Sequence, residues 1–414
     1  MARLLIVSDD LTGAFDASVP FVGMGVDVVA SPSSTRVGSL FGEGDGAVLA
    51  VNAASRHMSP LGAYLRVSSI VESACEAGVP ILLKKTDSVL RGNVGAELSA
   101  LWESTGRGCV HFVPAWPAMG RTTRGGIHLV GDVPVSESHF GRDPFEAVVS
   151  SHVRELLSGQ SDAPLLEVAE DEPVLAGFRG IAIYDATSEG ALQDRARELL
   201  SLGEERLALA GCAGLSHALA CELAAACAPA PLLDLGTEPL LAFCGSVNQV
   251  TVGQCRRARE AGAPSFDLSV AQKLDPGWVE GPEGRDFVAD VMRSWTESPL
   301  TVVDATSLDR ADAGEAACQN RDRISQNLGR ILARVCLGHP SGQVLAVGGD
   351  VLLALLDALG TERVRLLGEV ARGVVASELH MREGVIHVLS KSGGFGGEDL
   401  LLELSGSHGV EGRV

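Results

Sequence analysis

Short apolar runs alternate with longer segments of helical periodicity through the first half of the chain. Glycine, proline or polar residues bound each run, which favours buried strands, and the segments between them favour helices. Such alternation is typical of a mostly parallel sheet with helices on both faces. The predicted strands are 3–8, 26–30, 47–51, 79–84, 109–113, 181–184 and 207–210, and the clearest helices are 61–77, 94–104 and 190–202.

The same alternation resumes after a proline-rich stretch, residues 228–239, which is the best candidate for a linker. A chain of 414 residues is long enough for two domains. We therefore predict an α/β protein of two domains, 1–231 and 232–414, each a mostly parallel sheet with helices on both faces. The strands predicted in the second domain are 240–244, 300–303, 343–347 and 385–390, and its helices 248–261, 284–297, 312–335 and 351–359.

Composition excludes some classes of protein without indicating a function. The formal net charge of −20 disfavours a nucleic-acid partner. The longest apolar segment, 207–233, is interrupted by a histidine, a glutamate and two prolines, so no membrane span is expected. The nine cysteines include no CxxC pair, and the first residues form a strand pattern that turns acidic at once. Both features favour a cytoplasmic protein without a signal peptide.

Two adjacent carboxylates follow the first predicted strand. Asp9 and Asp10 stand where the apolar run ends, and a helical pattern begins just after them. In open α/β sheets, ligands bind at the carboxyl ends of the strands, so both residues are candidates for a substrate site. The alternative is that one of them only caps the following helix.

The densest polar turn follows the strand predicted at 79–84. It places Lys85, Asp87, Ser88 and Arg91 close together in the sequence. A guanidinium such as that of Arg91 can bind a carboxylate through two parallel hydrogen bonds, and the lysine and serine suit hydroxyl or carboxylate oxygens. The alternative is a solvated loop in which Asp87 or Ser88 caps the next helix.

Two further arginines are expected near the same edge of the sheet. Arg56 follows the third predicted strand and precedes Pro60, which suits the first position of a helix. Arg121 lies in the stretch 114–145, which is rich in glycine, proline and threonine and too long for a routine connection. His128 in that stretch has the apolar neighbours of a strand, and we interpret it as a structural histidine.

Three predicted strand-to-helix turns of the second half contain glycine, as phosphate-binding turns often do. Glycine lets a phosphate approach the backbone closely, and a helix N-terminus favours an anion. Each turn alone is typical of a tight connection, but the three together favour a nucleotide site. Asp350 could cap its helix, bind Mg²⁺ through water or act as a base. The candidate nucleotide-binding residues are Ser246, Gly348, Gly349, Asp350, Val351, Lys391, Gly393 and Gly394.

As a set, these segments resemble the four-carbon acid sugar kinase family over nearly the whole chain. The sequence departs from the family pattern at Val89, Asn248 and Val351, and in Gly373-Val374-Val375. The matching runs, in the family's order, are DDLTGA at 9–14, SR at 55–56, KTDSVLRGN at 85–93, PAWPAMGRTTRGGIHLV at 114–130, VPVSESHFGRDP at 133–144, GS at 245–246, GGD at 348–350 and KSGGFG at 391–396.

The resemblance implies an N-terminal acid-sugar domain, a C-terminal ATP domain and an active site in the cleft between them. It implies phosphorylation of a terminal hydroxyl of threonate, erythronate or 3-oxo-tetronate to the 4-phosphate, with ATP and Mg²⁺ as cofactors. On that basis the substrate carboxylate is neutralised by Arg91, Lys85 and either Arg56 or Arg121. The substrate site is completed by Asp9, Asp10, Asp87 and Ser88. The general base is Asp350, Asp10 or Asp87.

Two other functions stay open at this point. Because the departures at Asn248 and Val351 fall in the nucleotide motifs, the chain could be a sugar-acid sensor whose ATP site has decayed. An NAD-dependent dehydrogenase is less favoured, since no GxGxxG follows a strand. The expected partner is a small sugar acid, with no nucleic acid and no membrane, and a homodimer is one possible assembly.

Overall fold

A computed structural model describes residues 3–24, 26, 28–32, 48–142, 147–175, 177–203, 206–223, 233, 238–307, 315–338, 342–381 and 384–406. The chain forms two compact units, Met1–Ala230 and Pro231–Val414. The linker predicted at 228–239 falls almost entirely outside the described residues. In the described ranges, no helix is both long enough and apolar enough to cross a membrane.

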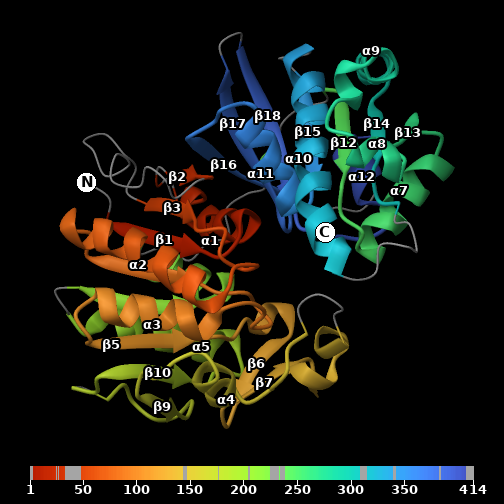
Figure 1. Ribbon diagram of the computed structural model, residues 1–414. Helices are drawn as coiled ribbons and strands as arrows, with labels where there is room; N and C mark the ends of the chain where they lie inside the picture. The colour runs from red at the N-terminus through yellow and green to blue at the C-terminus, as the bar shows by residue number, and fades with distance from the viewer. Residues whose placement is uncertain are drawn as a thin grey trace. The chain divides into compact units, whose positions relative to one another are not determined.

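The first unit is built on a parallel sheet, as predicted from the alternating pattern (Figure 1). Its strand order is β2-β3-β1-β4-β11-β5-β10-β9, and the edge strand β9 was not predicted. The central strands are buried along their whole length, as parallel strands covered on both faces must be. The strands are β1 (Leu4–Ser8), β2 (Val28–Ser31), β3 (Val48–Asn52), β4 (Ile81–Lys85), β5 (Cys109–Val113), β9 (Leu165–Val168), β10 (Gly180–Tyr184) and β11 (Leu207–Gly211).

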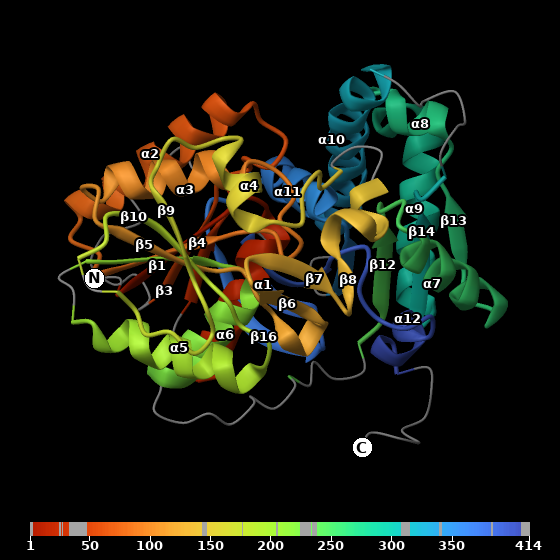
Figure 2. The same cartoon turned by 90° about the horizontal axis from the view of Figure 1, so that it is seen from below.

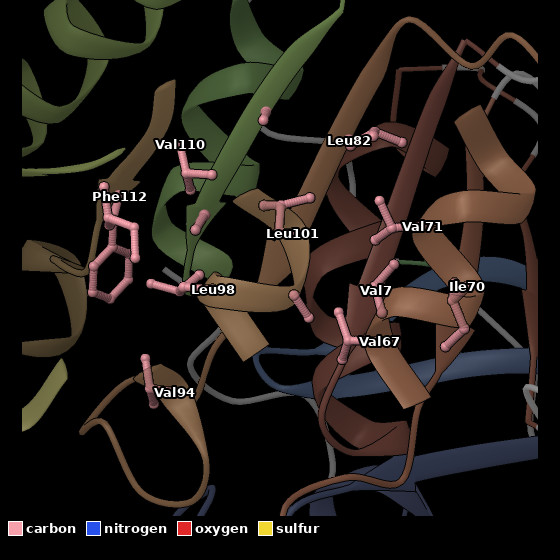
Figure 3. Packing of buried hydrophobic residues seen from close by; sticks show 14 of the residues in the cluster. Val7, Val67, Ile70, Val71, Leu82, Val94, Leu98, Leu101, Val110 and Phe112 are labelled. Carbon is pink, nitrogen blue, oxygen red and sulfur yellow. The ribbon is translucent and has the colours of Figure 1, made fainter. Parts of the chain in front are cut away.

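Helices cover both faces of this sheet, with α2 and α3 on one side and α5 and α6 on the other (Figure 2). Apolar side chains of α2 and α3 pack against the strands in one core cluster (Figure 3). Pro60 opens α2 as predicted, with Ser59 as N-cap. The helices are α1 (Leu11–Val22), α2 (Pro60–Glu76), α3 (Val94–Ser104), α4 (Val153–Ser158), α5 (Glu189–Ser201) and α6 (Ala213–Leu223).

The long glycine-rich stretch forms a small antiparallel sheet with three short 3₁₀ helices. Its tight turn at Gly125 and Gly126 has positive φ at both residues, and Asp185 accepts hydrogen bonds from both N–H groups at 2.6 and 3.1 Å. Residues 114–142 of the stretch therefore form a folded element that can present side chains, and the rest of it lies outside the described residues. Its parts are η2 (Pro117–Met119), β6 (Arg121–Arg124), β7 (Ile127–Val130), β8 (Val133–Pro134), η3 (Val135–Glu137) and η4 (His139–Arg142).

The second unit has a mixed sheet with strand order β13-β14-β12-β15-β18-β17-β16. Strands β12 to β15 and β18 are parallel, but β16, β17 and β18 form an antiparallel meander turning at Gly373, and the sequence pattern did not predict β16 or β17. These strands are β12 (Leu240–Cys244), β13 (Ser265–Asp267), β14 (Leu300–Asp304), β15 (Gln343–Val347), β16 (Val364–Ala371), β17 (Val374–Met381) and β18 (Gly384–Lys391).

Helices also pack on this second sheet. Cys255 and Ala258 of α7 share a core cluster with α12 and the strands, and α10 packs along α11. The long helix α10 begins at Glu315, close to the predicted start at 312. The helices are α7 (Gln249–Glu260), α8 (Val270–Leu274), η5 (Trp278–Glu280), α9 (Pro282–Glu297), α10 (Glu315–Gly338), α11 (Gly349–Ala358) and α12 (Leu400–Leu404).

Candidate active site

The carboxyl ends of β1, β3 and β4 bring the predicted acidic and basic side chains of the first unit together. Ser8 at the end of β1 is in register with Asn52 of β3 and with Lys85 of β4. The turns that follow these strands therefore leave the same edge of the sheet side by side. This edge is the place where open parallel sheets bind ligands.

Arg56 binds the carboxylates of three aspartates. Its Nε lies 2.6 Å from Asp9 Oδ2, one terminal nitrogen lies 2.6 Å from Asp10 Oδ2, and the other lies 3.5 Å from Asp87 Oδ1. Burial lowers the pKa of Arg56, but the carboxylates of Asp10, Asp9 and Asp87 outweigh it and raise this pKa well above its usual value. All three nitrogens thus lie close to a carboxylate, so Arg56 holds the three aspartates together.

Asp87 is held by Arg91 in a two-pronged ion pair. Arg91 Nε donates to Asp87 Oδ2 at 3.0 Å and one terminal nitrogen donates to Oδ1 at 2.8 Å. Burial raises the pKa of Asp87, but Arg91 and Arg56 lower it far below its usual range. The capping alternative for Asp87 is wrong, because Asn93 is the N-cap residue of α3. One hydrogen-bonding edge of Arg91 is thus occupied before any substrate binds.

Asp10 acts in part as a helix cap. Its Oδ1 accepts from the N–H of Gly13 at 2.7 Å, which fixes the start of α1, while its Oδ2 pairs with Arg56. The side chain of Asp10 is 27% exposed, so it lines the rim of the site. Its neighbour Asp9 is buried, and Arg56, Lys84 and Lys85 lower its pKa although burial alone would raise it.

A group of unpartnered polar atoms lies where β1 and β4 end. Within the described ranges, Ser8 Oγ, Asp9 Oδ1 and Thr86 Oγ1 are buried and have no hydrogen-bond partner. The Lys85 side chain is 5% exposed and makes no ion pair or hydrogen bond with the residues that the structure describes. A Cβ atom on Gly13 would lie 2.9 Å from both Lys85 Nζ and Ser8 Oγ, so these two atoms converge beside that glycine. We call Ser8, Asp9, Lys85 and Thr86 the open cluster.

Buried polar groups in proteins are rarely left unpaired, since each costs about 1–3 kcal/mol. The open cluster combines one carboxylate acceptor, two hydroxyl groups and one ammonium. A small ligand with both hydroxyl groups and a negative charge could satisfy all of them. The cluster therefore has the chemistry of a site for a hydroxy acid.

Behind the open cluster lies a buried ion pair that the sequence pattern did not reveal. Lys84 Nζ lies 2.9 Å from Glu97 Oε2, both side chains are only 1% exposed, and the hydroxyl of Ser55 donates to the other oxygen of Glu97. Burial raises the pKa of Glu97 more than Lys84 lowers it. One signal was present: successive residues of a buried strand face opposite sides, so Lys84 and Lys85 need separate partners.

Arg121 and His128 come from the small antiparallel sheet. Arg121 donates through one terminal nitrogen to the carbonyl of Met119, but its Nε is buried without a partner. His128 is the structural histidine that was predicted, because its ring nitrogens contact the Ser88 carbonyl at 2.9 Å and Thr123 Oγ1 at 3.1 Å. Burial lowers the pKa of His128 to about 4. The Ser88 hydroxyl makes no hydrogen bond within the described ranges.

The first-unit site holds one more basic than acidic side chain. A single negative charge on a ligand would therefore complete its charge balance. The basic side chains are Arg56, Lys84, Lys85, Arg91 and Arg121, and the acidic ones are Asp9, Asp10, Asp87 and Glu97.

In the second unit, the three glycine-containing turns meet at one edge of the sheet. Val347 at the end of β15 is in register with Cys244 of β12 and with Lys391 of β18. A Cβ atom on Gly393 would collide with the side chain of Ser246, so the turns after β12 and β18 touch. Gly348 requires glycine for another reason, because it has φ of 114° as N-cap residue of α11.

Helix α7 holds the turn after β18 in place. Thr251 Oγ1 donates to the Gly393 carbonyl at 2.8 Å, and Gln254 Nε2 donates to the carbonyls of Phe395 and Gly397 at 3.0 and 2.9 Å. Lys391 is 1% exposed and donates to the Ser392 carbonyl at 3.1 Å, and burial lowers its pKa to about 8. A lysine ammonium beside a glycine turn and a helix N-terminus suits a phosphate.

Asp350 lies in the first turn of α11 but does not cap it, because Gly348 is the N-cap residue and no side chain caps this helix. Its carboxylate is 48% exposed and pairs with Arg321 of α10 at 2.9 Å. Gly349 is the first residue of α11. An ideal Cβ atom on Gly394 would lie 3.5 Å from the amide nitrogen of Asn248. Gly349 is half-buried and Gly394 is exposed at this edge.

The residues that depart from the family pattern have structural roles. Asn248 is the N-cap residue of α7 and accepts from the Val250 N–H at 3.0 Å. Val351 is buried beneath Gly245, and Val89 is buried in a small apolar cluster. These residues thus keep the start of α7 and the packing around the turns.

The second-unit site could hold ATP through the first-turn N–H groups of α11, Lys391 and the turn after β18. Throughout the described part of the chain, no group of three or more His, Cys, Asp or Glu side chains could hold a metal ion alone. Mg²⁺ is usually bound by one or two carboxylates together with substrate phosphates. A Mg²⁺ held mainly by the nucleotide, with Asp350 as its protein contact, fits this donor set.

Both units match known families. The model of a family described as a sugar-binding N-terminal domain matches residues 4–219, and that of a nucleotide-binding C-terminal domain matches residues 241–401. The chain is 33% identical to D-threonate kinase of Bordetella bronchiseptica, covering 96% of this chain and 95% of that one. It is 28% identical to D-threonate kinase of Salmonella typhimurium, covering 97% of both chains. It is 26% identical to D-erythronate kinase of Heliobacterium modesticaldum, covering 96% and 95%.

The fold has solved counterparts as well. A structure from Salmonella typhimurium LT2 superposes with a TM-score of 0.79 at 21% identity, covering 98% of this chain and 99% of the other. A structure of a Haemophilus influenzae protein has a TM-score of 0.70 at 22% identity, covering 97% and 99%. These two similarities establish the fold alone.

Proposed function

Because the chain belongs to the four-carbon acid sugar kinase family and is therefore a sugar-acid kinase, we propose that it phosphorylates a tetronate such as D-threonate with ATP. The terminal hydroxyl oxygen forms a bond to the γ-phosphorus of ATP, and the bond from that phosphorus to the β,γ-bridging oxygen breaks. The hydroxyl proton passes to a base, and the products are ADP and the tetronate 4-phosphate. The open cluster is the observation that carries this proposal, because its unpartnered atoms match a hydroxy acid.

In the proposed complex, residues 1–231 bind the acid. Lys85 contributes an ammonium group that makes no ion pair or hydrogen bond within the described ranges, and Asp9 Oδ1 accepts a hydrogen bond from a substrate hydroxyl. Arg91 and Arg121 attract the carboxylate, while Asp10 and Asp87 hold Arg56 and Arg91 in place. Phosphoryl transfer depends mainly on such positioning and on charge neutralisation.

Residues 232–414 bind ATP in the same proposal. The α11 N-terminus and Lys391 contact phosphate oxygens, and Ser246 and Gly394 lie on the adjoining turns. Bound Mg²⁺ neutralises charge on the phosphates. Asp350 is the best candidate for the base or metal contact, because both oxygens of Asp10 and of Asp87 already accept hydrogen bonds or pair with arginine.

The direct test of the function is a product assay. The protein is incubated with MgATP and, separately, with D-threonate, D-erythronate, 3-oxo-tetronate and the neutral polyol D-threitol. Phosphorus NMR should show a new phosphate monoester, coupled to the protons of carbon 4, with at least one acid and none with the polyol. ADP formation without a phosphorylated acid, or no ADP with any acid, would contradict the proposal.

The buried lysine predicts how ATP use depends on pH. The free enzyme should lose kcat/KM for ATP as the pH rises through about 8, because Lys391 then loses the charge that attracts phosphate. Lys391 binds its proton less tightly in the folded protein than the usual pKa of 10.5 implies. Burial of the charged lysine therefore destabilises the fold below about pH 8, and this destabilisation decreases at higher pH. The expected loss of kcat/KM for ATP above pH 8 is thus not caused by unfolding of the site.

The measurement is initial rates from pH 6.5 to 9.5 at saturating acid, beside the variant Lys391→Arg. An arginine keeps its charge over this range, so a folded variant should show a flat profile. A wild-type profile that stays flat to pH 9.5 would contradict this prediction.

A further inference from the structure

The ring of Phe140 contacts two guanidinium groups of the first-unit site. The Cζ atom of Arg91 lies 5.7 Å from the ring centroid, and that of Arg121 lies 6.0 Å from it. Both distances are within the range in which an aromatic face attracts a cation. Phe140 thus links an arginine that follows β4 to an arginine of the small antiparallel sheet.

The position of Phe140 is fixed from behind. It lies in η4, its N–H donates to Ser138 Oγ at 3.1 Å, and its carbonyl accepts from the Val148 N–H at 3.1 Å. The ring is half-buried and packs against the apolar cluster that contains Val135 and Val148. A ring held in this way can orient the mobile ends of two long side chains.

The two arginines need such an orienting group, because like charges repel. Arg91 lowers the pKa of Arg121, although burial is the larger cause and Asp87 opposes both. Each guanidinium has a separate second anchor, Asp87 for Arg91 and the Met119 carbonyl for Arg121. The Phe140 ring contacts both guanidinium groups, and among the described residues the Nε of Arg121 has no hydrogen-bond partner.

We propose that Phe140 is a positioning residue that orients Arg91 and Arg121 toward one anion, the carboxylate of the acid substrate. The inference rests on the proposed function for the identity of that anion. Phe140 itself does not need to touch the substrate. Its ring makes the approach of the two guanidinium groups favourable and sets their direction, so the site selects acids over neutral polyols of the same length.

The first test removes the ring face and keeps the apolar volume. Phe140→Leu should raise the KM for D-threonate about tenfold and leave the KM for ATP and kcat unchanged, and Phe140→Tyr should behave as wild type. The matched control is Val148→Ala, which removes packing from the same cluster and touches neither arginine. It should lower the melting temperature without changing either KM. An unchanged KM for the acid in Phe140→Leu would overturn the proposal.

A double-mutant cycle separates positioning from general loosening of the site. Binding of D-threonate is measured by calorimetry without nucleotide in wild type, Phe140→Leu, Arg121→Gln and the double variant. If Phe140 acts through Arg121, Phe140→Leu should weaken binding about tenfold alone but less than threefold when Arg121 is absent. Equal losses in both backgrounds would contradict the proposal. Because the assay needs no phosphoryl transfer, it can succeed even if the product assay fails.

Discussion

Asp350→Asn is expected to lower kcat by roughly two orders of magnitude or more, the low end for a positioned acid–base group. Asp350 follows two glycines at the carboxyl end of β15 and lies in the first turn of α11, next to the turn that carries Lys391. Asparagine keeps the size and one carbonyl oxygen of aspartate, but it can neither accept a proton nor provide a carboxylate to Mg²⁺. The measurement is steady-state kinetics with both substrates saturating.

The matched control is Asp399→Asn in the same unit. Asp399 has the same 48% side-chain exposure as Asp350 and also pairs with an arginine, Arg257, at 2.7 Å. It should keep near-normal kcat, because it lies outside the glycine turns. If a folded Asp350→Asn variant kept as much activity as the control, the base or metal contact would have to be sought elsewhere, with Asp9 as the next candidate.

Lys84→Met is expected to lower the free energy of unfolding by about 3–5 kcal/mol, because it leaves the Glu97 carboxylate buried without its ionic partner. The 1% exposure of both side chains rules out compensation by water. Urea denaturation followed by circular dichroism measures the change. The double variant Lys84→Met/Glu97→Leu removes both charges and should recover part of the loss.

The same pair supports the geometry of the site. Ser55 donates to Glu97, and the Asn93 side chain binds the carbonyls of Ser55 and Met58 at 2.9 Å, so the turn that presents Arg56 is tied to α3. We therefore expect the single variant to lose affinity for the acid together with stability. A Lys84→Met protein as stable as wild type would show that the ion pair does not form.

The sequence was sufficient to predict the parts of the site that depend on strand ends. Apolar runs followed by polar turns place Asp9, Asp87 and Arg56 at one edge of a parallel sheet, and the structure brings them within ion-pair distance. The glycine turns of the second unit were predictable for the same reason. His128 was correctly interpreted, because its apolar neighbours indicate a strand and a buried imidazole needs partners.

The sequence did not allow us to predict which charged side chains pair with one another. The sequence pattern predicted Arg56 and Arg91 as substrate ligands. In the structure each guanidinium pairs with protein carboxylates, and the choice of carboxylate depends on distances between turns that are far apart in the chain. Lys84 of β4 pairs with Glu97 of α3. The two adjacent lysines indicate that each needs its own partner, but no local pattern identifies Glu97 as that partner. Strand β16 was missed because it is only partly buried over much of its length, which weakens the apolar signal.

The central claim is that the acid binds at the open cluster through Lys85. Calorimetric titration of D-threonate into wild type and into Lys85→Met tests this claim most directly. Lys273→Met is the control for loss of a buried lysine, because the Lys273 ammonium donates to the Ala305 carbonyl in the second unit. Loss of one charge-assisted hydrogen bond, worth about 1.5–3 kcal/mol, should weaken binding roughly 10- to 150-fold in Lys85→Met alone. ATP affinity should stay the same. Equal D-threonate affinity in wild type and a folded Lys85→Met variant would contradict the claim.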